Sequence, residues 1–198
     1  MRTKLYILIF FLFTTSGHIF AQQVKTITGF TLINAADKKE ISLESFKQAK
    51  GIVLVFTSNF CPYSKLYEKR ILDLHHAYGN KGIQFLLINP NDPVKSKDDS
   101  IEEMAKKARE KQFKFPYLAD KDQKVVKLLG ASKTPEAYLL RFKGGKFEVF
   151  YHGAIDDNPQ VPQDVSKNYL KDAIEALQSG RAVPIADVRP TGCMIKKN

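Results

Sequence analysis

With 198 residues, 43% of them hydrophobic, the chain is long enough for one domain with a packed core, and this composition excludes global disorder. Its formal net charge of +10 comes from lysines and arginines that are mixed with acids, as in the segment 120–124, Asp-Lys-Asp-Gln-Lys. Because no compact basic cluster or ladder of basic and aromatic residues is present, the charge predicts a solvated surface and no nucleic-acid partner.

The first 21 residues have the pattern of a signal peptide. Arg2 and Lys4 precede a short apolar run, residues 5–13, and the segment ends at Ala21. This pattern predicts cleavage after residue 21 and export, either to a periplasm or out of the cell, with no stable membrane span after cleavage. An uncleaved N-terminal anchor is the alternative. The mature chain is then expected to form a domain over residues 22–180, followed by a tail over 181–198.

The elements of the domain follow from periodicity, caps and turn residues. Alternation of apolar residues predicts a first strand, and continuous β-branched runs predict buried strands. Helical spacing, ended by glycine, predicts the helices, and Gly144-Gly145 predicts a hairpin turn. In chain order we expect a strand at 24–32, a short helix from 41, a strand at 52–56, a helix at 62–78, a strand at 83–88, a helix capped by residues 98–100 and running to 111, a short connection at 115–118, a short helix at 123–129, a hairpin of 134–140 and 146–151, and a helix at 165–177.

Cys61 stands where the central strand gives way to the first long helix, with Pro62 in the first turn. Free amide N–H groups and the positive end of the helix dipole favour the thiolate at such a position. The thiolate is the nucleophilic form of cysteine, so Cys61 is the candidate reactive residue. A buried inert cysteine is the alternative. Cys193 is the other cysteine, and the two could form a structural staple, a catalytic pair or two independent thiols.

Three strings in the chain resemble a known family. The order strand, turn, Cys-Pro, helix resembles the active-site segment of the thioredoxin superfamily, and FTSNFCPYSKLYE resembles its redoxin branch, the AhpC/TSA-like thioredoxin family proteins. The strings TPEAYLL and RPTGCMIKK resemble later parts of the same branch. The resemblance implies an α/β, thioredoxin-like fold with an N-terminal β extension and a C-terminal tail folded back on the active-site face.

The resemblance also implies a set of site residues. Cys61 would be the nucleophile, Thr134 and a cis Pro135 would form the opposing wall, and a trans proline that opens a strand is the alternative. Neighbours of the nucleophile would shape the surface around the sulfur, namely Phe60, Pro62, Tyr63 and Ser64. Supporting roles are suggested for Lys65, Asp156 and Asp157, although adjacent acids in a loop often serve only as caps.

Two departures from the family pattern bear on the chemistry. Ser64 stands where thioredoxins carry their second cysteine, and Leu54 stands where the peroxiredoxin signature carries proline. Ser64 cannot resolve a mixed disulfide, which leaves Cys193, in the family-like tail, as the candidate resolving cysteine. The absent proline argues against an efficient peroxidase.

These observations lead to two hypotheses. The first is an exported thiol–disulfide oxidoreductase or thiol peroxidase-like redoxin that acts on a protein or small-molecule thiol, disulfide or peroxide and is recycled by a reductant protein. The second is a non-catalytic thioredoxin-fold protein in which Cys61 and Cys193 form a permanent staple. No cofactor is expected, and no metal site either, because the histidines of the mature chain show no ligand spacing with the cysteines.

Overall fold

The computed structural model describes residues 25–196, so the expected signal peptide over residues 1–21 lies outside the described part of the chain. Four α-helices occur among the described residues: α1 (Pro62–Tyr78), α2 (Ile101–Glu110), α3 (Lys124–Leu129) and α4 (Tyr169–Gln178). The strands are β1 (Thr26–Ile27), β2 (Thr31–Asn34), β3 (Glu40–Ser42), β4 (Gly51–Phe56), β5 (Ile83–Asn89), β6 (Tyr117–Ala119), β7 (Lys133–Thr134), β8 (Glu136–Lys143), β9 (Lys146–Gly153), β10 (Asp187–Val188) and β11 (Cys193–Met194).

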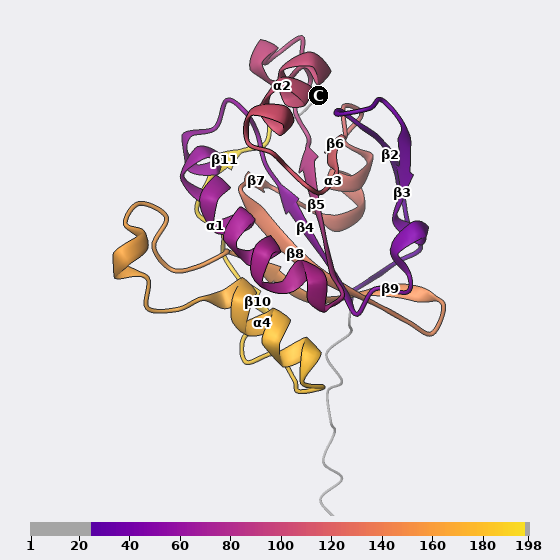
Figure 1. The fold of residues 1–198 in the computed structure, drawn as a ribbon, viewed down its shortest axis with the longest axis vertical. Helices are drawn as coiled ribbons and strands as arrows, with labels where there is room; N and C mark the ends of the chain where they lie inside the picture. The colour runs from indigo at the N-terminus through magenta and orange to yellow at the C-terminus, as the bar shows by residue number, and fades with distance from the viewer. Residues whose placement is uncertain (1–24, 197–198) are drawn as a thin grey trace, which may run out of the picture.

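A mixed sheet runs through the centre of the molecule in the order β1-β9-β8-β4-β5-β6-β2-β3 (Figure 1). The strand β4 is buried along its whole length and pairs in parallel with β5 and antiparallel with β8. The next strand along the sheet, β6, pairs in parallel with β5, so α1 and α2 are crossover connections. The predicted order of a βαβ unit, a β-hairpin and a final helix is therefore confirmed.

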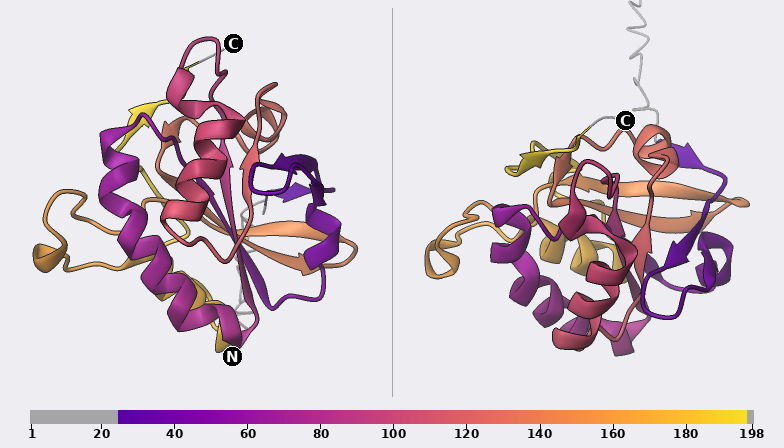
Figure 2. Two further views of the ribbon diagram at one scale, coloured as in Figure 1. Left: turned by 45° about the horizontal axis from the view of Figure 1, so that its top comes forward. Right: turned by 90° about the horizontal axis from the view of Figure 1, so that it is seen from above.

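Alternating residues of β4 enter two separate cores. Val53 and Val55 pack in a cluster with buried residues of α1, α2 and α4, whereas Leu54 and Phe56 join a second cluster with residues of α3 and the N-terminal strands. Figure 2 shows the same division, with α1, α2 and α4 on one side of the sheet and α3 and β11 on the other. Burial on both faces explains why β4 and β5 read as continuous apolar runs.

Several boundaries differ from the sequence prediction. The first strand is divided into β1 and β2, and Gly29 between them has a φ of 141°, a value that favours glycine. The expected connection at 115–118 contributes a strand, β6. The last helix starts at Tyr169 rather than at 165, because Asp157 binds the backbone N–H groups of Ser166 and Lys167 and keeps that segment in the preceding loop.

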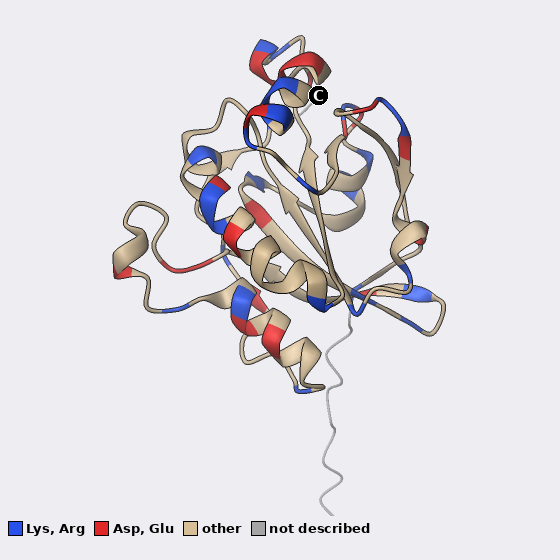
Figure 3. Ribbon diagram, in the orientation of Figure 1, with Lys and Arg blue, Asp and Glu red and all other residues tan. Residues whose placement is uncertain are grey.

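The tail after α4 is packed against the domain by two short strand pairings. The strand β10 pairs in parallel with β9, and β11 pairs antiparallel with β7. Acidic and basic residues are interspersed along α1, α2 and α4 (Figure 3). None of the helices within residues 25–196 has the length and apolar character needed to cross a membrane.

Candidate functional site

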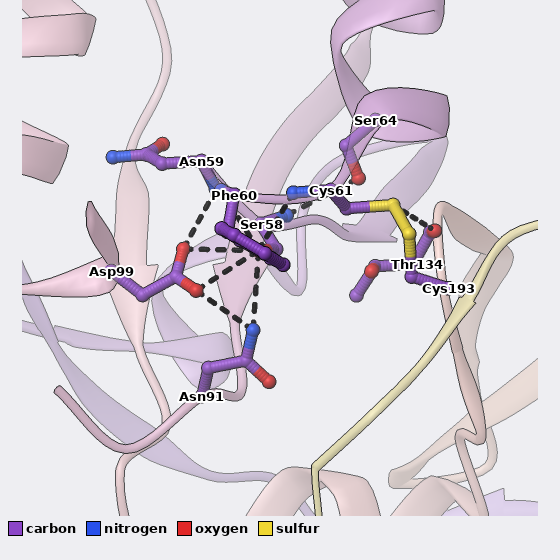
Figure 4. The surroundings of a disulfide bond; sticks show 9 residues. All are labelled: Ser58, Asn59, Phe60, Cys61, Ser64, Asn91, Asp99, Thr134 and Cys193. Carbon is purple, nitrogen blue, oxygen red and sulfur yellow. Dashed lines mark hydrogen bonds between the residues drawn. A yellow bond between two sulfur atoms is a disulfide. The ribbon is translucent and has the colours of Figure 1, made fainter. Parts of the chain in front are cut away.

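The two cysteines meet beyond the carboxyl end of β4, where sites form in open α/β sheets (Figure 4). Cys61 is the N-cap residue of α1, and Pro62 occupies its first turn, as the sequence predicted. Cys193 lies in β11 and is joined to Cys61 by a disulfide, with a Cα–Cα distance of 6.0 Å. The expectation of a tail folded back on this face is thus confirmed.

The loop that contains Pro135 forms the opposite wall. The Thr134–Pro135 bond is cis, and Cys193 stands opposite Thr134 in the pairing of β11 with β7. The sulfur of Cys61 lies 3.0 Å from the carbonyl oxygen of Thr134. In the disulfide this sulfur carries no proton, but a reduced thiol in the same place could donate a hydrogen bond to that carbonyl.

The predicted residues around the nucleophile differ in their exposure. Phe60 is 54% exposed, and its ring centroid lies 4.9 Å from the ammonium nitrogen of Lys196 in the tail. Pro62 is exposed and Tyr63 is half-buried. The Cys61 residue itself is only 1% exposed. The rim of the site is therefore accessible, while the buried cysteine is covered in this oxidised state.

Ser64 is completely buried and faces the loop before Cys61. Its hydroxyl oxygen accepts a hydrogen bond of 3.3 Å from the backbone N–H of Ser58. In this structure the side chain therefore holds the 57–61 loop against α1 and presents no group at the surface. Contact of Ser64 with a bound substrate stays a prediction.

A buried carboxylate that the sequence analysis missed holds the same loop. Asp99 is 1% exposed and comes from the segment between β5 and α2. The Ser58 hydroxyl donates to this carboxylate and accepts from the backbone N–H groups of Phe60 and Cys61. The carboxylate also accepts hydrogen bonds from the backbone N–H of Asn59 and the side chains of Asn89, Asn91 and Ser96.

The charge state of Asp99 follows from these contacts. Burial alone would raise its pKa, but the hydrogen bonds from Asn89, Asn91, Ser96 and the Asn59 backbone outweigh burial and hold the pKa below its ordinary value. The carboxylate is therefore ionised at neutral pH. In the sequence, Asp99 looks like part of a helix cap; the polar string Asn89-Pro90-Asn91 after a buried strand was the one sign of its partners.

A second buried carboxylate, Glu136, lies beneath the Pro135 loop. It accepts hydrogen bonds from the backbone N–H groups of Ser132 and Lys133. Its other oxygen contacts the Tyr138 hydroxyl at 2.8 Å and His152 Nε2 at 2.7 Å. Burial works to raise the pKa of Glu136, but these hydrogen bonds lower it below the ordinary value.

His152 connects this carboxylate to the tail. Its Nδ1 atom lies 3.2 Å from Asp187 Oδ2 in β10, so the ring bridges Glu136 and Asp187. Burial lowers the pKa of His152, but the hydrogen bonds to Glu136 and Asp187 raise it above the ordinary value. No motif in the sequence pointed to this bridge: the β8–β9 hairpin brings Glu136 to His152, and the pairing of β9 with β10 adds Asp187.

Of the three residues suggested for supporting roles, Asp156 and Asp157 form contacts elsewhere in the domain. Asp156 is buried, accepts from the Tyr67 hydroxyl at 2.7 Å and forms an ion pair of 2.7 Å with Arg70, which ties the loop after β9 to α1. Asp157 binds backbone N–H groups within its own loop. Lys65 is exposed on α1. Their influence on the chemistry of Cys61 stays a prediction.

The chain is similar to a known protein family and to several solved structures. A model of the AhpC/TSA family matches residues 24–149, and no curated protein matches the chain. Among solved structures, an uncharacterized conserved protein from Geobacillus kaustophilus has a TM-score of 0.81 at 34% identity, covering 88% of this chain and 92% of that one. A hypothetical protein from Sinorhizobium meliloti has a TM-score of 0.81 at 28% identity, covering 90% of this chain and 96% of that one.

A putative thiol:disulfide interchange protein DsbE from Chlorobium tepidum has a TM-score of 0.60, covering 79% of this chain and 98% of that one. At 16% identity this likeness shows the fold alone. The thioredoxin-like fold with its N-terminal β extension is thereby confirmed.

Proposed function

Since the chain belongs to the AhpC/TSA family, we propose that it is a thiol oxidoreductase in which Cys61 is the nucleophile and Cys193 the resolving cysteine. The observation that carries the proposal is the disulfide between the N-cap residue of α1 and the tail, beside the cis Pro135 loop. The helix N-terminus favours the thiolate form of Cys61. Because residue 64 is a serine, the second thiol is supplied by Cys193 in the tail.

The reaction on a disulfide substrate takes place in two steps. The Cys61 thiolate attacks one substrate sulfur, which forms a mixed disulfide and releases the other substrate sulfur as a thiolate. The Cys193 thiolate then attacks the sulfur of Cys61, releases the second substrate thiol and forms the disulfide seen here. Two electrons have passed from the cysteine pair to the substrate, and a dithiol reductant protein restores the pair.

Burial indicates where that reductant attacks. Cys61 is 1% exposed in the oxidised protein, whereas Cys193 is half-buried. A reductant thiolate therefore reaches Cys193 more readily, and attack there releases Cys61 as the leaving thiolate. Because the helix N-terminus favours the thiolate form of Cys61, Cys61 is the better leaving group as well.

We further propose that the protein is exported. The basic and apolar pattern of residues 1–21 supports this, and a disulfide persists in oxidising compartments outside the cytosol. The domain of residues 22–180 and the tail of 181–198 would then form the mature chain, with the tail acting as the carrier of the resolving thiol.

A redox titration of the mature chain tests the enzymatic proposal against a permanent staple. We expect the disulfide to open in thiol buffers at a potential above about −300 mV, the level below which structural disulfides typically lie. Alkylation of the free thiols, followed by mass spectrometry, gives the reduced fraction. A potential well below that level would support the staple.

Trapping of intermediates tests the roles of the two cysteines. The Cys193→Ser variant should accumulate mixed disulfides on Cys61 when a disulfide substrate is added, because no internal thiol can resolve them. The Cys61→Ser variant is the matched control and should form none through the nucleophilic route. Accumulation on Cys193 in that control, and not on Cys61 in the first variant, would reverse the assignment. Addition of a peroxide in place of the disulfide shows whether the same pair supports thiol peroxidase-like chemistry.

A further inference from the structure

The end of the tail contacts the domain as an extended peptide ligand would. The strand β11 places Cys193 opposite Thr134 and Met194 opposite Lys133. Beyond β11, the backbone N–H of Ile195 donates to the carbonyl of Ser132 at 2.9 Å. The Gln123 side-chain amide donates to the backbone carbonyl of Lys196. These contacts use the tail backbone, so another extended segment could make them.

Two positions of the tail are selective for their side chains. At Gly192, a Cβ atom would lie 2.4 Å from the carbonyl oxygen of Thr134, so only glycine fits without a shift of backbone. Ile195 is 7% exposed and belongs to the buried cluster that includes Val125 and Leu129. Removing an aliphatic side chain from such a site loses its transfer free energy and leaves a cavity.

Of the two positions between them, 193 holds the cysteine and 194 is open. Met194 is 66% exposed, so its side chain is not selected by the site. The groove that holds residues 192–196, here termed the tail groove, therefore sets requirements at three of four consecutive positions. It requires glycine, then the cysteine that reaches Cys61, then any residue, then an aliphatic residue.

We propose that the tail groove is also the client site, and that the clients are proteins presenting an extended segment with the sequence glycine, cysteine, any residue, aliphatic residue. This inference rests on the proposed function and adds the class of substrate. The tail then acts as an intramolecular competitor, whose effective concentration at the groove is set by its tether. A client enters when the disulfide is open and the tail has left.

The covalent step is the first step of the proposed reaction. The Cys61 thiolate attacks the client cysteine sulfur of a client disulfide, the sulfur–sulfur bond of the client breaks, and its partner sulfur leaves as a thiolate. The client cysteine then occupies the place that Cys193 has in the oxidised protein. Attack by Cys193 on Cys61 releases the client thiol and returns the tail to the groove.

The experiment uses the full mature chain with Cys193→Ser and synthetic peptides that copy residues 189–197. The peptide cysteine is first joined to 5-thio-2-nitrobenzoate, so that attack by Cys61 releases this coloured thiolate. Four peptides are compared: the unchanged sequence, Gly192→Val, Ile195→Ser and Met194→Ser as the matched control. The disulfide of cysteine with the same thiolate reports the intrinsic reactivity of Cys61.

We expect the Gly192→Val and Ile195→Ser peptides to react about tenfold or more slowly than the unchanged peptide, because overpacking or lost burial typically costs that factor or more. The Met194→Ser peptide should react within about twofold of it, as expected for a change at an exposed position. Adding Ile195→Ser to the tail of the Cys193→Ser protein should loosen the competitor and speed the reaction of the unchanged peptide.

The outcomes separate this inference from the proposed function. Equal rates for all four peptides would overturn the client motif, while leaving Cys61 as a working nucleophile. Peptides that react more slowly than the small disulfide in both protein variants would also overturn it and favour small substrates. No reaction with any reagent, the small disulfide included, would refute the proposed function itself.

Discussion

Removal of the Asp99 carboxylate should both destabilise the protein and release the loop that positions Cys61. In the folded state the carboxylate accepts hydrogen bonds from three nitrogen donors: the Asn59 backbone and the side-chain amides of Asn89 and Asn91. The hydroxyls of Ser58 and Ser96 also donate to it, but these can turn toward other acceptors. The nitrogen donors therefore determine the magnitude of the effect.

Asp99→Ala removes the charged acceptor of these three buried donors, of which Asn89 and Asn91 keep a weaker contact, with the hydroxyls of Tyr117 and Ser58. A hydrogen bond to a charged group contributes about 1.5–3 kcal/mol, and several are lost together, so we expect a loss of about 3–5 kcal/mol in the free energy of unfolding. Asp99→Asn should cost less, about 1–3 kcal/mol. The reason is that the Asn91 side-chain oxygen is buried without a partner. If the Asn91 side chain turns over, this oxygen can accept a hydrogen bond from the new amide group at position 99.

The same carboxylate predicts a pH dependence. Because its pKa in the folded protein is depressed below 3.8, its contribution to stability is fully present above that value and is lost as the pH falls through the folded pKa. The difference in unfolding free energy between wild type and Asp99→Asn should therefore be constant at neutral pH and should narrow in acid.

Urea unfolding at several pH values measures both effects, with Asp98→Asn as the matched control. Asp98 is the adjacent carboxylate and is exposed, so its substitution should change stability by no more than about 0.5 kcal/mol. The rate at which the reduced protein re-forms its disulfide provides a second readout, and Asp99→Asn should slow it. Equal stability of Asp99→Ala and Asp98→Asn would refute the role of the network, and an unchanged reoxidation rate would refute its role in positioning Cys61.

Three further predictions concern the tail. Gly192→Ala places a Cβ atom 2.4 Å from a β7 carbonyl, so the reduced variant should re-form its disulfide about tenfold more slowly in timed alkylation; a wild-type rate would contradict this. Burial lowers the pKa of His152, but Glu136 and Asp187 raise it above 6.5. The contribution of His152 to stability should therefore be complete below pH 6.5 and should decline as the pH rises through its pKa in the folded protein. In urea unfolding, the His152→Gln variant should lack this decline. The bond between Cys61 and Cys193 spans 132 residues, for which the chain-entropy model gives about 5 kcal/mol, so reduction should lower the urea midpoint of the wild type but not of Cys193→Ser.

The centre of the fold could be predicted because local and global signals agree there. The apolar run of β4 is long enough to be buried on both faces, and the residues after it repeat with helical spacing. Pro62 is compatible only with the first turn of a helix, which fixed the start of α1 and made Cys61 its N-cap residue. Each of these signals lies within a few residues of the structure it specifies.

The site was only partly predictable because its buried polar contacts join distant segments. Ser100 was predicted as part of a helix cap, and its hydroxyl does accept from the backbone N–H of Glu103. Asp99 beside it faces the opposite way, toward the 57–61 loop, and nothing in the local sequence distinguishes the two residues. The bridge from Glu136 through His152 to Asp187 depends likewise on the pairing of β9 with β10, which a tail with two prolines and no periodicity does not reveal.

In the proposed function, the buried carboxylates of Asp99 and Glu136 support the chemistry through position rather than through proton transfer. Both have a pKa below the ordinary value, so both remain ionised at neutral pH and neither is poised to take the proton of a thiol. Their hydrogen bonds go instead to the backbone of the two loops that enclose the disulfide: Asp99 holds the loop before Cys61, and Glu136 holds the loop before Pro135. In the reaction proposed above, activation of Cys61 then comes from the N-terminus of α1, which favours the thiolate without a general base. It follows that substitution of either carboxylate should act through the position of its loop, and should slow formation of the Cys61–Cys193 disulfide without removing a proton acceptor.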